Sequence, residues 1–319
     1  CFFPLLLFQA GGSPGGAMRR AQANGLLLVA ALIWGTAFVA QQTGMRDVGP
    51  FTFTGSRFLF GAVMIAPLAF MELRRLGRRG TFLDVRDLLA CALLGAVLFL
   101  GAALQQIGIM STTVSNAGFL TALYVPLVPI AGALLLRERS HWSVWPASLG
   151  CLGGTYLLGG GSLSALTVGD LWVIASALFW AAHVMLVGRV AARKGASVTV
   201  AMLQFLVVGV LGMAVGLGTE EVSTVALERA LPSIAYAGIL SVGVGFTLQV
   251  VAQRHTPAAD AAILLSCETL FAALAGRLVL GETLTVAQMS GGLLIFACVL
   301  AVQILPLWRA RRAVAVEAG

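Results

Sequence analysis

Residues 88–109 read LLACALLGAVLFLGAALQQIGI and contain no charged side chain. An α-helix needs about 20 consecutive apolar residues to cross the hydrocarbon core of a bilayer. Comparable stretches recur along the whole chain, in which 59% of the residues are hydrophobic and 10% are charged. Soluble domains average about 45–50% apolar and about 25% charged residues. A soluble fold of 319 residues could not cover so much apolar surface, so the composition indicates that lipid is the solvent.

Ten apolar segments are long enough to be placed in a membrane by this criterion. They lie at residues 25–43, 50–71, 86–109, 115–137, 143–160, 169–189, 197–217, 231–252, 258–280 and 285–307. The linkers between them are short, so we expect one compact unit. The predicted fold class is an all-α integral membrane protein with ten transmembrane helices.

The basic residues between these segments predict how the chain is oriented. With a cytoplasmic N-terminus, 16 of the 20 Lys and Arg residues fall on the inner side, and only Arg46 and Arg229 fall outside. Cytoplasmic loops of membrane proteins carry such an excess of Lys and Arg. We therefore expect a multi-pass protein of a bacterial inner (plasma) membrane with both termini in the cytoplasm. Because the net charge of +7 comes from short clusters between apolar runs, it predicts contact with the bilayer and not with nucleic acid.

The second half of the chain repeats the polar landmarks of the first. The spacing is 144 residues for three pairs and 146 for the two tryptophans: Gln105 and Gln249, Asn116 and Asp260, Glu138 and Glu282, and Trp34 and Trp180. Arg57-Phe58 and Gln204-Phe205 are 147 residues apart. Each half has five predicted helices, an odd number, so the second half must be inverted in the membrane relative to the first. Inverted repeats around a site near the bilayer midplane are a common architecture of secondary transporters.

The ends of the chain are expected to lie outside the two repeats. An apolar stretch with no basic residue before it is not typical of a signal peptide, and Met18 stands directly before a pair of arginines. We expect a non-native or mistranslated leader at 1–17, the first five-helix repeat at 18–161, the second at 165–308, and a cytoplasmic basic tail at 309–319.

The chain resembles the drug/metabolite transporter superfamily, and its EamA-type members in particular, in a series of short motifs. The resemblance lies in the order of these motifs along the chain and in their duplication. The resemblance runs from about Asn24 to Gln303. The motifs of the first half are Leu32-Ile33-Trp34-Gly35, Pro50 with Ser56-Arg57-Phe58-Leu59, Gln105-Gln106-Ile107-Gly108, Phe119-Leu120-Thr121 and Tyr124-Val125-Pro126. Those of the second half are Gly169-Asp170-Leu171, Trp180, Ser266-Cys267-Glu268-Thr269 and Gly281-Glu282.

The resemblance implies ten helices, a central cavity, and export or uptake of amino acids, nucleobases or related metabolites without an ATP motor. Two positions depart from the family pattern. The family commonly has proline where this chain has Thr269, so the residue that would loosen the ninth helix is missing. It also often has glycine at the position of Arg137.

Two charged residues at membrane depth are the first candidates for a functional role, because burying a charge in the bilayer is energetically unfavourable and such residues usually have a function or a partner. Arg57 could hold a substrate carboxylate through a two-pronged hydrogen bond, or serve as a structural partner of a carboxylate or of helix carbonyls. Glu268 could carry a proton, because a carboxyl group that is desolvated shifts towards its neutral form. Its alternative is a static ion pair with Arg57 or a hydrogen bond to a neighbouring helix.

The other cavity candidates are aromatic or hydroxyl-bearing residues. Trp34 and Trp180 occupy equivalent positions away from the membrane interfaces, where tryptophan usually gathers, and could line the cavity or pack the halves together. His183 lies on nearly the same helix face as Trp180 and could relay protons or simply bond a backbone carbonyl. Thr121 and Tyr124 lie one turn apart, and Tyr124 is the repeat counterpart of Glu268.

Motifs for nucleotide binding, zinc hydrolysis or a serine nucleophile do not occur in the sequence. The five cysteines stand singly and the three histidines are far apart, so we expect no catalytic residues, no metal and no cofactor. We predict a secondary transporter, an exporter of small metabolites, whose partners are a small-molecule substrate and the lipid bilayer. Proton coupling and an uncoupled facilitator are both open alternatives; a homodimer is compatible with the sequence but not indicated by it. A membrane enzyme or scaffold fits the duplicated polar residues less well.

Overall fold

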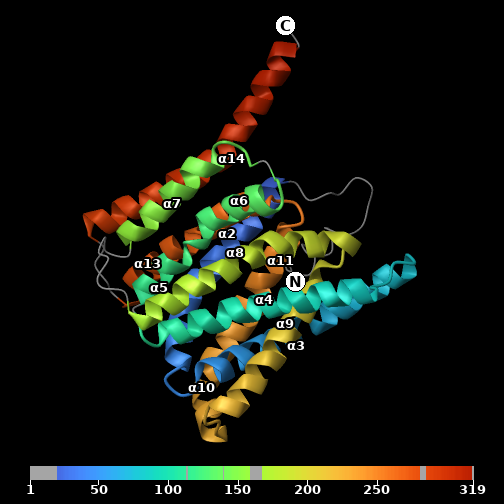
Figure 1. Ribbon diagram of the computed structural model, residues 1–319, viewed down its shortest axis with the longest axis vertical. Helices are drawn as coiled ribbons and strands as arrows, with labels where there is room; N and C mark the ends of the chain where they lie inside the picture. Colours follow the sequence, from blue (N-terminus) through green and yellow to red (C-terminus); the bar gives the residue numbers. More distant parts are fainter. Residues whose placement is uncertain (1–19, 113, 139, 159–166, 281–284, 318–319) are drawn as a thin grey trace.

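The computed structural model describes residues 20–112, 114–138, 140–158, 167–280 and 285–317, and every secondary-structure element in them is a helix (Figure 1). The predicted leader and the linker between the two predicted repeats lie outside these residues, as does Glu282. In chain order the helices are α2 (Arg20–Gly44), α3 (Pro50–Arg78), α4 (Val85–Ile109), α5 (Val114–Thr121), α6 (Tyr124–Leu135), α7 (Val144–Leu158), α8 (Val168–Lys194), α9 (Ser197–Thr219), α10 (Thr224–Tyr236), the π-helix η1 (Ala237–Phe246), α11 (Thr247–Ala252), α12 (Ala258–Leu265), α13 (Cys267–Leu280) and α14 (Val286–Glu317).

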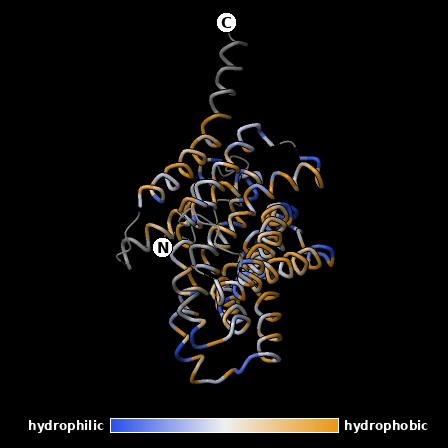
Figure 2. Tube along the Cα trace, turned by 60° about the vertical axis from the view of Figure 1, so that its left-hand side comes forward, coloured by the Kyte–Doolittle hydropathy of each residue, from blue (hydrophilic) through white to orange (hydrophobic). Residues whose placement is uncertain are grey.

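Seven helical stretches in the described residues are long and apolar enough to cross a membrane. They are Arg20–Phe38, Pro50–Arg78, Val85–Ile109, Ala117–Leu135, Val168–Lys194, Ser197–Thr219 and Thr224–Ala252. The other three predicted segments correspond to α7, which has 15 residues, to α12 and α13, which a break separates, and to α14, whose apolar stretch in the described residues is Val286–Val302. Hydrophilic residues gather at the helix ends and in the linkers, as expected of helices in lipid (Figure 2).

Two of the predicted helices are broken in the middle. The segment predicted at 115–137 is divided into α5 and α6, and the segment predicted at 258–280 is divided into α12 and α13 at Ser266. Pro126 explains the first break, because proline has no N–H to donate to the carbonyl of Ala122 four residues earlier. Val125 N donates to that carbonyl instead, at 3.0 Å.

The second break has no proline and is made by hydroxyl groups. Ser266 Oγ donates to the carbonyl of Ile263 at 2.7 Å, and Thr269 Oγ1 donates to the carbonyl of Ser266 at 2.9 Å. Serine and threonine that bond back to the preceding turn compete with the helical backbone bonds and bend helices. Residues 122 and 266 are 144 apart, the spacing of the polar repeat, so both breaks lie at equivalent places in the two halves.

The two halves pack closely because glycine residues face each other at their contacts. A Cβ atom at Gly212 of α9 would lie 2.7 Å from Cα of Gly55 in α3, and one at Gly169 of α8 would lie 2.7 Å from the carbonyl of Gly108 in α4. Small residues of this kind let membrane helices approach. Gly154 of α7 packs in the same way against the carbonyl of Gly291 in α14. These glycines pack against other helices of the same chain.

Candidate functional site

A cavity of about 60 Å³ lies where the two halves meet, with room for a few water molecules. Both halves supply its walls, including the residues next to the two helix breaks. The lining residues are Trp34, Phe38, Gln41, Arg57, Gln105, Thr121, Tyr124, Trp180, Val184, Ser241, Phe246, Gln249, Leu265 and Glu268.

The structure brings six of the seven candidate site residues to this cavity, and His183 does not line it. The six come from α2, α3, α5, α6, α8 and α13, which belong to both halves of the chain. Their substrate-binding role stays a prediction; what the geometry adds is that they surround one space.

Arg57 is 3% exposed and has no ion-pair partner within 4.0 Å among the described residues. Its guanidinium carbon lies 5.5 Å from the ring centre of Phe53 and 5.3 Å from that of Phe58. Within the described part of the chain its Nε atom also lacks a hydrogen-bond partner. Aromatic faces attract a cation but do not replace the hydrogen bonds it loses with water, so Arg57 retains donor capacity for an anion.

Glu268 is 8% exposed and lies in the first turn of α13, directly after the break at Ser266. The positive end of a helix dipole favours a negative charge at this position. A Cβ atom at Gly35 would lie 2.6 Å from the carbonyl of Glu268, so the glycine that follows Trp34 lets α2 approach the cavity wall. No ion pair joins Glu268 to Arg57 in the part of the chain that the structure describes, although both face the same cavity.

Aromatic rings form one wall. Phe246 of η1 lies between the two tryptophans, with its ring centre 4.6 Å from that of Trp34 and 6.0 Å from that of Trp180. The Trp180 and Phe246 planes differ by only 14°, a stacked arrangement. Trp34 Nε1 donates to the carbonyl of Ser241 at 3.1 Å. A Cβ at Gly245 would lie 2.7 Å from that same Nε1 atom, so glycine permits the close approach of the indole to η1.

The hydroxyl-bearing candidates flank the first helix break, with Thr121 at the end of α5 and Tyr124 at the start of α6. Thr121 Oγ1 donates to the carbonyl of Ala117 at 2.7 Å and accepts from Gln105 Nε2 at 2.8 Å. Tyr124 is buried, and its hydroxyl donates to the carbonyl of Ala262 in α12 at 3.5 Å, across the boundary between the halves. Gln105, Thr121 and Tyr124 therefore form a polar strip on the first half's side of the cavity.

His183 is fully buried behind the aromatic wall. Its Nε2 atom lies 2.9 Å from Oε1 of Gln204, and its ring meets those of Trp180 and Phe246 edge to face. Gln204 is the repeat counterpart of Arg57, so the position that carries a free cation in one half carries an amide bound to histidine in the other.

Phe246, Ser241 and Leu265 line the cavity although sequence reasoning did not select them. Nothing in their residue types distinguishes them from other residues of apolar helices. Gln41, Gln105 and Gln249 did carry a signal, because amides at membrane depth need partners, but for most such residues the sequence favoured hydrogen bonds between helices over contact with a substrate.

A second cavity, of about 370 Å³, lies towards the end of the bundle that holds Arg189 and Arg254. Val184 lines both cavities, so at this end the two are separated by little more than one layer of side chains. Arg189 pairs with Glu138 at its rim. The pKa of His255, which also lines it, is lowered by partial burial and by the charge of Arg254.

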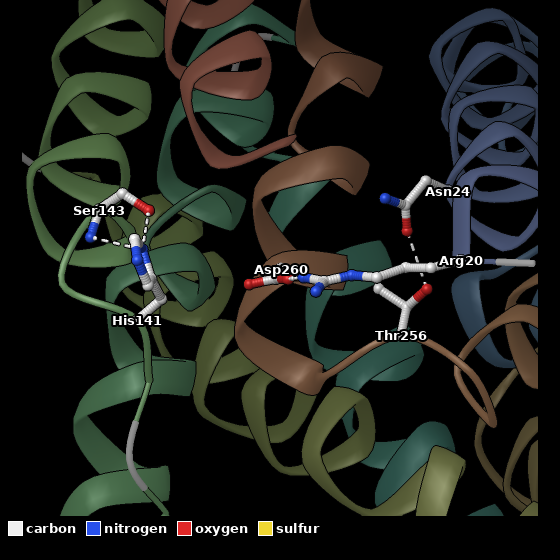
Figure 3. Close-up of polar contacts among 6 residues, drawn as sticks. All are labelled: Arg20, Asn24, His141, Ser143, Thr256 and Asp260. Carbon is white, nitrogen blue, oxygen red and sulfur yellow. Dashed lines mark hydrogen bonds and ion pairs between the residues drawn. The ribbon is translucent and has the colours of Figure 1, made fainter. Parts of the chain in front are cut away.

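Polar contacts join the two halves beside this second cavity (Figure 3). Arg20 at the start of α2 forms an ion pair with Asp260 of α12, and Thr256 Oγ1 lies 2.9 Å from Asn24 Oδ1. His141, whose Nδ1 lies 2.7 Å from Ser143 Oγ, stands on the other side of Asp260 in the view.

The family and the relatives that this sequence matches are named as transporters. The EamA-like transporter family matches the chain twice, over residues 22–160 and 167–303. An uncharacterized transporter of Archaeoglobus fulgidus is 29% identical over 299 residues, covering 93% of this chain and 90% of the relative. The uncharacterized inner membrane transporter YedA of Escherichia coli O6:H1 is 25% identical over 287 residues, covering 86% of this chain and 89% of its own length.

A solved crystal structure has the same fold, with a TM-score of 0.73 at 20% sequence identity over 93% of this chain and 99% of that one. The double match agrees with the duplicated landmarks of the sequence and with the equivalent helix breaks. The chain therefore belongs to the EamA-like transporter family, and it is a multi-pass membrane transporter and not an enzyme.

Proposed function

We propose that the protein is a secondary transporter that exports small metabolites, such as amino acids or nucleobase-like compounds, by alternating access of its two halves. The observation that carries this proposal is the cavity between the halves, which Arg57 and Glu268 line with a basic and an acidic side chain that do not pair with each other. We further propose ten membrane spans in two inverted five-helix repeats at 18–161 and 165–308, with both termini in the cytoplasm.

The cavity chemistry supports a substrate that carries both charge and a flat or apolar part. Arg57 has free donors for a carboxylate or carbonyl, and Glu268 offers an acceptor for an ammonium or N–H group. Trp34, Trp180 and Phe246 offer ring faces to the remainder of the molecule. A wholly apolar compound would leave the polar groups of Arg57 and Glu268 without a partner in the membrane, which is unfavourable.

The size of the cavity supports alternating access. A space of about 60 Å³ is too small for an amino acid together with its hydration, so the halves must separate for a substrate to enter. Inverted repeats that rock around a fixed central site provide such a movement. Export as the direction rests on the resemblance to EamA-type proteins alone.

Transport by purified protein in liposomes tests the proposal. Counterflow is screened with pools of amino acids, nucleobases and aromatic metabolites, with and without a pH gradient. We expect one pool to exchange, and a variant with Arg57→Gln to lose the exchange while a control with Arg78→Gln, at an exposed arginine of the same helix, keeps it. If no pool exchanges while the protein stays helical and monodisperse, the metabolite proposal is wrong. Exchange that equilibrates the substrate without accumulating it, and that neither a pH gradient nor an ionophore changes, would identify an uncoupled facilitator.

A further inference from the structure

Two threonine hydroxyls tie the halves of the protein together at two separate places. Thr256, in the linker before α12, donates through Oγ1 to Oδ1 of Asn24 in α2 at 2.9 Å. Thr112, in the linker before α5, donates through Oγ1 to Oδ1 of Asp170 in α8. In each pair one residue belongs to the first half and the other to the second. Asn24, Thr256 and Asp170 are all buried.

The two contacts are copies of each other in the repeat. Asn24 and Asp170 are 146 residues apart, which is the spacing of Trp34 and Trp180. Thr112 and Thr256 are 144 residues apart, which is the spacing of Gln105 and Gln249. Equivalent positions of inverted halves lie at opposite ends of the bundle, so one contact is expected at each end.

The helix geometry agrees with this placement. Thr256 lines the second cavity together with Arg189, and Arg189 is 19 residues beyond Asp170 on the continuous helix α8. At 1.5 Å per residue this distance is about 28 Å, close to the thickness of the hydrocarbon core. Trp34 follows Asn24 by ten residues and Trp180 follows Asp170 by ten residues. The central cavity therefore lies about halfway between the two threonine contacts.

We infer that the Asn24–Thr256 and Thr112–Asp170 contacts are the two gates of the transport path, one at each end of the central cavity. This inference rests on the proposed alternating access and names the residues that perform it. Both contacts are formed in the structure, and the cavity between them is small. Transport requires each to open while the other stays closed.

Hydrogen bonds of this kind suit a contact that must break in every cycle. The net stabilisation from one hydrogen bond is small, since water replaces the lost partner when the halves separate. Both threonines lie in linkers that lead into the first part of a broken helix, α5 or α12. Opening either contact can therefore shift that short helix without bending a long one.

The gates differ in what stands beside them. The Asn24–Thr256 contact is accompanied by the Arg20–Asp260 ion pair, which also joins the halves (Figure 3). Beside the second gate the additional contact between the halves is a hydrogen bond, from Thr167 Oγ1 to the carbonyl of Ser111 at 3.5 Å. Asp170 also accepts from Thr167 within its own half, at 2.9 Å from the hydroxyl and 2.8 Å from the amide. We therefore expect the two gates to open with unequal ease.

The gates can be tested by chemical labelling, which needs no substrate. The five native cysteines are replaced by alanine, and a reporter is introduced in the cavity wall by Ser241→Cys. A membrane-impermeant maleimide is added to right-side-out or to inside-out vesicles. Removing one hydroxyl by Thr256→Val or by Thr112→Val should increase labelling at least about threefold from one face of the membrane only, and the two variants should favour opposite faces.

Matched variants separate the lost hydroxyl from a disturbed fold. Thr256→Ser and Thr112→Ser keep the hydroxyl and should label at the rate of the parent. Two valine variants that raise labelling from the same face, or that leave it unchanged from both, would overturn the inference. Counterflow is measured separately, so an inactive transporter with correctly sided gates would contradict the proposed substrate class and not the gates.

Cross-linking gives a second readout if a valine variant does not fold. The pairs Asn24→Cys with Thr256→Cys, and Thr112→Cys with Asp170→Cys, are oxidised by a copper–phenanthroline catalyst with dioxygen as the electron acceptor. Each disulfide should slow labelling of the reporter at least tenfold from the face that its gate controls, and reduction should restore it. Disulfides that form fully at both ends without changing labelling would show that neither contact closes the path.

Discussion

Glu72 and Glu220 form a reciprocal pair of helix caps between the halves: Glu72 caps the start of α9, and Glu220 caps the start of α3. Glu72 lies in α3, and its carboxylate accepts hydrogen bonds from the amides of Val198 and Thr199 at the start of α9, at 3.3 and 2.7 Å. Glu220 follows α9 and accepts from the amides of Phe51 and Thr52 at the start of α3, both at 2.8 Å. Neither helix has a side-chain cap from its own N-cap residue, so each receives its negative charge from the other half.

This exchange of caps predicts a specific loss of stability. Glu220→Ala removes two charge-assisted bonds to α3 and should lower the free energy of unfolding by about 1–2 kcal/mol, the usual range for a lost helix cap. Thermal unfolding in detergent measures the change. Glu221→Ala is the control, because Glu221 is an exposed neighbour, and it should leave the midpoint unaltered. Equal destabilisation by both would argue against the cap.

The glycine contact between α3 and α9 predicts that two Gly→Ala substitutions in α9 change the stability of the protein in opposite directions. Gly212→Ala would bring a methyl group within 2.7 Å of Cα of Gly55 and should destabilise the protein by separating the halves. Gly218→Ala in the same helix meets nothing within 4 Å and should stabilise it slightly, because alanine is the better helix former by about 1 kcal/mol. Thermal unfolding of the two variants side by side distinguishes packing from propensity.

Arg57 is predicted to bind substrate through its planar guanidinium group. Arg57→Lys keeps the charge but loses the two-pronged geometry and the stacking on Phe53 and Phe58, so we expect transport efficiency to fall at least about tenfold, mainly through a higher KM. Counterflow kinetics at several substrate concentrations provide the measurement. An unchanged KM with a lower thermal midpoint would assign Arg57 a structural role instead.

Glu268 is predicted to couple transport to protons. Glu268→Gln cannot exchange a proton, so accumulation driven by a pH gradient should be lost while counterflow, which needs no net proton movement, persists. Glu221→Gln, outside the cavity, controls for the general effect of removing a carboxylate. Full gradient-driven accumulation by Glu268→Gln would refute the proton-carrying role.

Much of the helical organisation could be predicted because it depends on patterns that span many residues. Apolar length indicated where helical segments lie, although two of them are broken, and the shared spacing of Gln105 and Gln249 revealed the duplication that the family match also contains. The break at Ser266 could not be predicted from such patterns. Hydropathy is continuous there, no proline marks the place, and the cause is the direction of two hydroxyl bonds.

The cavity was predictable only in its polar and aromatic part. Arg57, Glu268, Trp34 and Trp180 stand out at membrane depth, and all four line the cavity. Phe246 resembles every other apolar residue of its segment, and its place between the tryptophans depends on how η1 turns. His183, one helical turn from Trp180, does not line the cavity and lies beside Gln204, and its role in moving protons stays a prediction.

The two interruptions in the bundle differ in how permanent they are. The one before α6 is built into the covalent structure, because Pro126 can never supply the missing amide. The one at Ser266 is held by two hydroxyl rotations and could be undone by straightening the chain. The break in the first half is therefore rigid, and the break in the second half is a flexible hinge. Unequal stiffness of this kind would assign most of the deformation in each cycle to α12 and α13.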